Sequence, residues 1–281
     1  MPRKNKKIII ISIAAVVAVA VTAAVILLMP KKIKASEPIS ISGVTDKSDI
    51  TLTAHRGFSC NAPENTVPAI LAAGEKGYKY AEFDVRLTED MVWVVSHDKK
   101  IDRMTNGKGK ISDYTYFELS KYKIDNGANI KNYENLKIPT LDAALEACLE
   151  SGLVPMIEIK DYNTDALQSL NNSIKKYGYE KNCCIISFNY DILNDFAKIN
   201  PDAKLLFLVS KLDKEHMELC LSDKNIGVSF KADKKKNNPE KIKELQENGN
   251  DLFCWTVNDE DTLAFYAENG VKNFVTDRIV P

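Results

Sequence analysis

The sequence predicts a (β/α)8 barrel preceded by one N-terminal transmembrane helix. Short apolar runs rich in β-branched and aromatic residues recur between residues 52 and 276, and stretches with helical spacing lie between most of them. Eight such runs within residues 51–281 fit a closed parallel barrel better than an open sheet. Near the N-terminus, 22 consecutive and almost entirely apolar positions predict the transmembrane helix.

The charge balance narrows the functional class. The 281-residue chain has 38 Lys and Arg residues against 39 Asp and Glu residues, with a net charge of -1. A nucleic-acid partner usually requires a basic patch or stripe, and nothing in this balance indicates one. We therefore expect no nucleic-acid partner.

Residues 8–29 form the predicted membrane anchor, because 1.5 Å per residue lets them cross a hydrocarbon core of about 30 Å. The flanking basic residues are Arg3, Lys4, Lys6 and Lys7 before the segment and Lys31, Lys32 and Lys34 after it. The slight excess of basic residues on the N-terminal side predicts that residues 1–7 lie inside the cell and that the chain after Pro30 lies outside. The protein would then be a single-pass protein of the cell membrane. A cleaved signal peptide is the alternative, although its apolar part is usually only about 7–15 residues and "KIKAS" is a poor cleavage site.

Residues 30–50 are polar, rich in Ser and Lys, and without a sustained period, so we expect a linker and a folded domain that begins near Thr51. The six cysteines are widely spread and include no C-x-x-C pair, which argues against a zinc site or a disulfide scaffold. Several lie in apolar runs, where a free thiol acts as a small hydrophobic side chain. An external location still leaves one disulfide open.

The predicted strands and helices follow one another along the chain. The strands cover residues 52–55, 80–85, 155–159, 183–187, 204–208, 226–230, 252–257 and 273–276. Helical spacing is clearest at 67–77, 140–152, 189–200, 239–249 and 259–270, and these stretches end in the Gly or Asn typical of helix C-termini. In such a barrel the chemistry belongs at the C-terminal ends of the strands.

Two segments break this alternation. A β-rich run at 92–96 follows the second strand too closely for a parallel crossover, so we expect it to fold back as a hairpin arm and to return His97 to the barrel mouth. Residues 98–139 are too long for a simple loop and predict an insertion over the mouth. Its aromatic residues Tyr114, Tyr116, Phe117 and Tyr122 suit the packing of a small subdomain, with contact to a leaving group as the alternative.

Acidic residues on two strands predict a cation site. Side chains two apart on a strand share a face, which pairs Glu82 with Asp84 and Glu158 with Lys160 among apolar neighbours. Buried carboxylates need a cation or donors. As hard oxygen ligands, the three acids suit Mg²⁺ or Ca²⁺, and neutralisation by Lys160 or Arg56 is the structural alternative.

His55 closes the first predicted strand, and His97 follows the hairpin arm. Two imidazoles at one end of the barrel are what acid and base catalysis near neutral pH requires. Arg56 can offer a planar fork to a phosphate, and Lys160 a point charge. Together with the acids, these groups indicate metal-assisted cleavage of a phosphate ester. His216 has helix-like surroundings, and we expect it to be structural.

Nine ordered motifs within residues 51–281 carry a specific resemblance. They are "HRG" (55–57), "PENT" (63–66), "EFDVRLTED" (82–90), "VVSHD" (94–98), "RMTNGKG" (103–109), "IPTLDAAL" (138–145), "IEIK" (157–160), "WTVN" (255–258) and "VTD" (275–277). This sequence resembles the glycerophosphodiester phosphodiesterase family. The resemblance implies a TIM barrel with a small insertion after the "HD" motif and metal-dependent hydrolysis of glycerophosphodiesters to glycerol 3-phosphate and an alcohol.

The resemblance also implies roles for individual residues. His55 and His97 would be the acid and base, although which does which stays open. The implied metal ligands are Glu82, Asp84 and Glu158, and the implied phosphate ligands are Arg56 and Lys160. Trp255 matches the aromatic wall beside the substrate glycerol, with core packing as the alternative. Glu64 would orient the site, with a role at the helix start as the alternative. In the family's usual scheme a glycerol hydroxyl is the nucleophile, and water then opens a cyclic phosphate.

The predicted anchor bears on the substrate. Because it would hold the barrel mouth near a membrane, lipid-derived diesters, lysophospholipids or an envelope polyglycerolphosphate join small soluble diesters as expected substrates. One rival interpretation is a barrel phospholipase acting on membrane lipids, which would need an apolar mouth. The other is a non-catalytic, envelope-anchored binding module, against which the full set of acids and histidines argues.

Overall fold

The computed structural model of the protein describes residues 32–41 and 49–281. The predicted anchor, residues 8–29, lies outside this range. Within the described residues, no helix combines the length and apolar character needed to cross a membrane.

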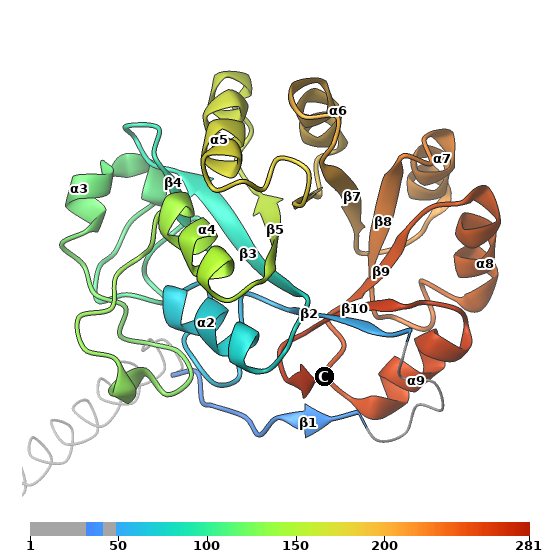
Figure 1. Cartoon of the computed structure of the whole chain (residues 1–281), viewed down its shortest axis with the longest axis horizontal. Helices are drawn as coiled ribbons and strands as arrows, with labels where there is room; N and C mark the ends of the chain where they lie inside the picture. The colour runs from blue at the N-terminus through green and yellow to red at the C-terminus, as the bar shows by residue number, and fades with distance from the viewer. Residues whose placement is uncertain (1–31, 42–48) are drawn as a thin grey trace, which may run out of the picture. The chain divides into compact units, whose positions relative to one another are not determined.

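Eight parallel strands form the predicted barrel (Figure 1). They are β2 (Thr51–Ala54), β3 (Tyr80–Leu87), β5 (Val154–Ile159), β6 (Cys184–Ser187), β7 (Lys204–Val209), β8 (Ile226–Lys231), β9 (Leu252–Trp255) and β10 (Asn273–Thr276). Neighbours along the chain pair with one another, and the barrel closes because β2 pairs with both β3 and β10. All eight predicted strands are therefore confirmed, with shifts of one or two residues at their ends.

Seven helices connect these strands on the outside of the barrel (Figure 1). They are α2 (Val67–Glu75), α4 (Leu141–Glu150), α5 (Thr164–Lys176), α6 (Tyr190–Ile199), α7 (Lys214–Ser222), α8 (Pro239–Asn248) and α9 (Glu260–Glu268). Each begins after a Thr, Asn or Asp whose side chain accepts a hydrogen bond from the first turn. These caps end each strand-to-helix loop at a defined residue, which positions the loops around the barrel mouth.

Strand β4 (Trp93–Val95) folds back antiparallel to β3, as predicted, with Val95 opposite Val85. The insertion that follows contains the 3₁₀ helices η1 (Ile111–Asp113) and η2 (Ile130–Asn132) and the short helix α3 (Tyr116–Leu119). A small hydrophobic core joins Val94 of β4 to five residues of the insertion, namely Ile101, Ile111, Leu119, Ile124 and Ile138. Tyr114, Tyr116 and Tyr122 pack against this core, whereas the Phe117 side chain is 72% exposed.

The expected linker, residues 30–50, is not uniformly a linker. Ile39 and Ser40 form strand β1, which pairs in parallel with β11 (Ile279–Val280) outside the barrel. Ile39 and Ile41 also pack against the main core. A two-residue strand has too few positions to show a sequence period, so its pairing could not be predicted from residues 30–50 alone.

Two hydrophobic layers support the barrel. One fills its interior with side chains such as Met156, Leu206 and Phe253, and the other lies between the strands and the surrounding helices. All six cysteines fall within the described residues, and all are buried free thiols. The cysteines therefore serve as small core side chains in this structure.

Candidate active site

The chain turns sharply where β2 ends. Arg56 and Gly57 both have left-handed backbone angles, with φ values of 55° and 74°. A Cβ atom on Gly57 would lie 2.6 Å from the carbonyl carbon of Ala69 in α2, so only glycine fits. The backbone N–H of Arg56 donates to Oε2 of Glu82 at 2.7 Å, which compensates for the unfavourable conformation at Arg56. This turn positions His55 and Arg56 at the barrel mouth.

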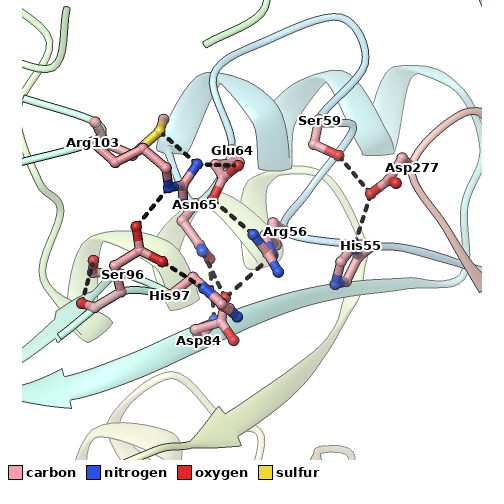
Figure 2. A network of polar contacts seen from close by, with 12 residues as sticks. His55, Arg56, Ser59, Glu64, Asn65, Asp84, Ser96, His97, Arg103 and Asp277 are labelled. Carbon is pink, nitrogen blue, oxygen red and sulfur yellow. Dashed lines mark hydrogen bonds and ion pairs between the residues drawn. The ribbon is translucent and has the colours of Figure 1, made fainter. Parts of the chain in front are cut away.

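His55 is oriented by the carboxylate of Asp277, which directly follows the last barrel strand. Its Nδ1 atom lies 2.7 Å from Oδ1 of Asp277, and the same oxygen accepts a hydrogen bond from Ser59 (Figure 2). The other oxygen, Oδ2, accepts from Asn258. Although burial opposes ionisation of Asp277, the hydrogen bond from His55 holds its pKa at about 2. Burial lowers the pKa of His55, but Asp277 and Glu82 outweigh this effect and raise it overall.

His97, which follows the hairpin arm β4, is also held by a carboxylate. Its Nδ1 atom lies 2.8 Å from Oδ1 of Asp98. The backbone carbonyl of His97 accepts two hydrogen bonds from Arg86, at 3.0 and 2.9 Å, and Arg86 is itself paired with Asp161. An ionised carboxylate only accepts hydrogen bonds, so both histidines carry their proton on Nδ1 and leave Nε2 free for chemistry.

The three predicted acids come together as buried neighbours. Asp84 on β3 and Glu158 on β5 are register partners, and Glu82 lies two positions before Asp84 on the same face. One carboxylate oxygen of each acid lies within 4.8 Å of the others. Asn65 donates to Oδ2 of Asp84 at 2.7 Å and thereby fixes this carboxylate.

Burial and mutual repulsion give the three acids different pKa values. Burial, followed by the charge of Asp84, raises the pKa of Glu82 to about 7 and that of Glu158 to about 8. Burial also opposes ionisation of Asp84, but the charges of Lys160 and Arg56 outweigh it and lower its pKa well below the ordinary value. A hard divalent cation fits this set, because its charge would offset both the burial and the repulsion that raise the pKa of Glu82 and of Glu158.

Two positively charged side chains, Lys160 and Arg56, lie beside these acids. The Nζ atom of Lys160 lies 2.9 Å from Oδ1 of Asp84 and 2.5 Å from Oε1 of Glu158. The Nε atom of Arg56 is buried without a hydrogen-bond acceptor, although Oδ2 of Asp84 lies 3.6 Å away. An unsatisfied buried guanidinium donor favours an anionic ligand such as a phosphate oxygen.

These groups line a pocket of about 180 Å³ at the barrel mouth. Its polar side is formed by His55, Arg56, Glu82, His97, Glu158 and Lys160, and its other side by Ile186, Phe188, Leu208, Ser229, Trp255, Thr256 and Val275. Trp255 donates from Nε1 to the carbonyl of Ser229 and meets Phe188 edge-on at 5.7 Å. The pocket therefore presents charged groups and an apolar wall to the same ligand.

Glu64 and Arg103 connect Arg56 with Asp98, the carboxylate that contacts His97. The carboxylate of Glu64 accepts from Nη1 of Arg56 at 2.9 Å and from Nη2 of Arg103 at 2.6 Å (Figure 2). Arg103 comes from the insertion and also binds Asp98. Glu64 does not line the pocket itself, so its position suits orientation of Arg56.

Sequence reasoning assigned no role to several residues that hold the site, namely Asn65, Arg86, Arg103 and Asp277. All four lie within motifs of the resemblance, which was the available signal: "PENT", "EFDVRLTED", "RMTNGKG" and "VTD". His216 does not line the pocket and instead contacts Asp213, the N-cap of α7.

Comparison with known proteins assigns the family. A profile of the glycerophosphoryl diester phosphodiesterase family matches residues 55–280. A glycerophosphodiester phosphodiesterase of Caldanaerobacter subterraneus subsp. tengcongensis is 34% identical over 80% of this chain and 92% of its own. The human glycerophosphodiester phosphodiesterase 1 is 26% identical over 82% of this chain and 78% of its own.

A solved structure shows the same architecture. A phosphodiesterase of Oleispira antarctica, determined in complex with the product sn-glycerol-3-phosphate, superposes with a TM-score of 0.74. It is 26% identical and covers 81% of this chain and 92% of its own. The fold, the matched residues and these relatives lead to one assignment. The chain belongs to the glycerophosphoryl diester phosphodiesterase family of enzymes.

Proposed function

We propose that this enzyme hydrolyses glycerophosphodiesters, whether small and soluble or lipid-derived, to glycerol 3-phosphate and an alcohol, with the help of Ca²⁺ or Mg²⁺. The observation that carries the proposal is the cluster of three buried carboxylates, two of which, Glu82 and Glu158, line a pocket together with two histidines and two cationic side chains. Family membership and the product bound to the Oleispira relative support the substrate class.

The residues divide into three groups by their chemistry. Glu82, Asp84 and Glu158 would hold the cation, which supplies positive charge against the phosphate oxygens when bound. Arg56 and Lys160 bind the phosphate and orient it within the pocket. Trp255 packs on the apolar side, where a glycerol backbone has carbon atoms to cover.

His55 and His97 perform the proton transfers. In the first step, one Nε2 atom takes the proton from the attacking glycerol hydroxyl and the other gives a proton to the leaving alkoxide, which forms a cyclic phosphate and releases the alcohol. Water then opens the cyclic phosphate to give glycerol 3-phosphate. Asp277 and Asp98 keep each ring in the tautomer that exposes Nε2 to the pocket.

Release of glycerol 3-phosphate tests this function. The full-length protein is incubated with glycerophosphocholine, glycerophosphoglycerol or lysophosphatidylcholine, first with EDTA and then with Ca²⁺ or Mg²⁺ restored. We expect no reaction with EDTA. With metal restored, we expect glycerol 3-phosphate from glycerophosphocholine and glycerophosphoglycerol, which ranks these two leaving groups, whereas cleavage of lysophosphatidylcholine would release choline and leave lysophosphatidate. Folded protein that releases nothing from any of the three with either metal would refute the proposal.

We propose further that residues 8–29 anchor the enzyme in the cell membrane, with residues 1–7 inside and the catalytic domain outside. The support is the length of the apolar segment and its flanking charges. Carbonate-resistant sedimentation with membranes and protease digestion of the catalytic domain in intact cells test it. A mature protein whose mass lacks the first 29 or more residues would instead establish a cleaved signal peptide.

A further inference from the structure

Arg103 belongs to the insertion but extends its side chain to the polar side of the active site. Its backbone carbonyl accepts a hydrogen bond from the buried Asn126, also in the insertion, at 2.9 Å. The guanidinium donates from Nε to Oδ2 of Asp98 at 2.5 Å, and from Nη2 and Nη1 to the two oxygens of Glu64 at 2.6 and 3.1 Å. One planar group thus joins two carboxylates from separate loops.

Each of these carboxylates contacts a residue that lines the pocket. Asp98 uses its other oxygen to bind Nδ1 of His97 at 2.8 Å. Glu64 binds Nη1 of Arg56 at 2.9 Å through the same oxygen that accepts from Nη2 of Arg103. The result is a continuous chain of charged hydrogen bonds from His97 through Asp98, Arg103 and Glu64 to Arg56 (Figure 2).

We propose that Arg103 is a positioning residue, which fixes His97 and Arg56 relative to each other by holding Asp98 and Glu64 at the same time. Arg103 does not line the pocket, so it acts only through these two carboxylates. The expected loss of activity rests on the proposed function. The positioning of His97 by Arg103 can be tested without any measurement of activity.

The geometry distinguishes Arg103 from a residue that only fastens the insertion to the barrel. If Arg103 only fastened the insertion, a single contact with either carboxylate would suffice. A positioning role needs contacts with both Asp98 and Glu64, and a lysine cannot donate to both as a fork. Loss of the guanidinium would leave Asp98 with His97 as its remaining side-chain partner, and the ring could then reorient. Displacement of a reacting group by about 1 Å can reduce the rate about 100-fold.

The first test observes the histidines directly. The chain has only three histidines, so ¹⁵N labelling of histidine in the full-length protein gives three sets of ring signals. In EDTA, we expect R103Q to shift the ring nitrogens of His97 and to leave those of His216 unchanged. K121Q is the matched control, because Lys121 is an exposed insertion residue whose ammonium lies over Phe117, and it should shift none of the three sets.

The second test is kinetic. For glycerophosphodiester hydrolysis, we expect R103Q to lower kcat/KM by about 10- to 100-fold, R103K to fall between R103Q and wild type, and K121Q to match wild type. If R103Q loses its cooperative melting transition and is therefore unfolded, R103K replaces it, and the His97 ring signals and kcat/KM of R103K test the proposal. Should either the His97 signals or kcat/KM stay at the wild-type value, Arg103 only fastens the insertion and the proposal is wrong. A wild-type protein without diesterase activity would refute the proposed function instead, and the His97 signals alone would then decide the role of Arg103.

Discussion

The Nδ1 atom of His55 lies 2.7 Å from Oδ1 of Asp277, although 222 positions separate the two residues in the sequence. Closure of the barrel explains the contact, because Ala54 at the end of β2 is the register partner of Thr276 at the end of β10. The residues that follow each strand therefore emerge side by side. A residue that follows the last barrel strand thus orients a residue that follows the first.

This contact predicts that D277N lowers kcat/KM by about 10- to 100-fold, because an amide can no longer hold the Nδ1–H tautomer of His55 as a charged acceptor. Steady-state kinetics with a soluble glycerophosphodiester measure the effect. S59A is the control, since Ser59 donates to the same carboxylate at 3.2 Å without touching the ring, and its effect should be smaller. Equal losses in both variants would mean that the carboxylate has only a structural role.

The same carboxylate predicts a pH dependence of stability. The pKa of Asp277 is lowered from 3.8 to about 2, so its ionised form stabilises the folded state above pH 3.8. This contribution is lost as the pH falls from 3.8 towards 2. The melting temperature of D277N should therefore fall less steeply than that of wild type over this interval. Parallel curves for the two proteins would contradict the expected linkage.

Replacement of either His55 or His97 by alanine should lower the rate by about 100- to 10,000-fold, because in the proposed mechanism each ring would supply one of the two proton transfers. H55A and H97A are compared with H216A, which alters a residue outside the pocket and should retain wild-type activity. Circular dichroism confirms that each variant is folded. A variant at His55 or His97 with near-full activity would remove that histidine from the mechanism.

Metal binding should stabilise the protein more strongly as the pH rises. Because the pKa of Glu82 is about 7 and that of Glu158 about 8, the folded protein holds protons there that the unfolded chain releases above its ordinary pKa of 4.5. Stability without metal therefore falls as the pH rises through this range, and a cation must displace these protons to bind. The increase in melting temperature on adding Ca²⁺ or Mg²⁺ should be larger at roughly pH 9 than at roughly pH 6.

E158Q provides the control for that measurement, because it removes one ligand charge and one displaced proton. The variant should show a smaller increase and a weaker dependence on pH. If metal raised the melting temperatures of wild type and E158Q equally at both pH values, the stabilising ion would be bound elsewhere.

Substitution of Gly57 by alanine should destabilise the fold by about 2–4 kcal/mol, as the sum of a left-handed backbone and overlap with α2. G152A separates the two costs, because Gly152 has a φ of 67° but open space around the Cβ position. We expect G152A to cost only about 1 kcal/mol. Chemical denaturation measures both free energies of unfolding, and equal values would show that the contact with Ala69 relaxes freely.

The barrel could be predicted from the sequence because its strands are buried on both faces and read as short apolar runs. The candidate ligands could also be predicted, since Glu82 and Asp84 interrupt such a run with two charges on one face. Asp277 and Arg103 could not be assigned by this reasoning. Their partners are distant in the sequence, and a single charge after a strand or in a loop is usually exposed to solvent.

Strand β1 has a practical consequence for choosing fragments of the protein. Thr51 is the boundary that sequence patterns suggest, but a fragment that starts there lacks Ile39 and Ser40, the partners of Ile279 and Val280. Asp277 lies only two residues before that pair and orients His55. Trimming the chain at Thr51 would therefore remove the strand that pairs with the segment after Asp277, and a poorly active truncated preparation would misrepresent the enzyme.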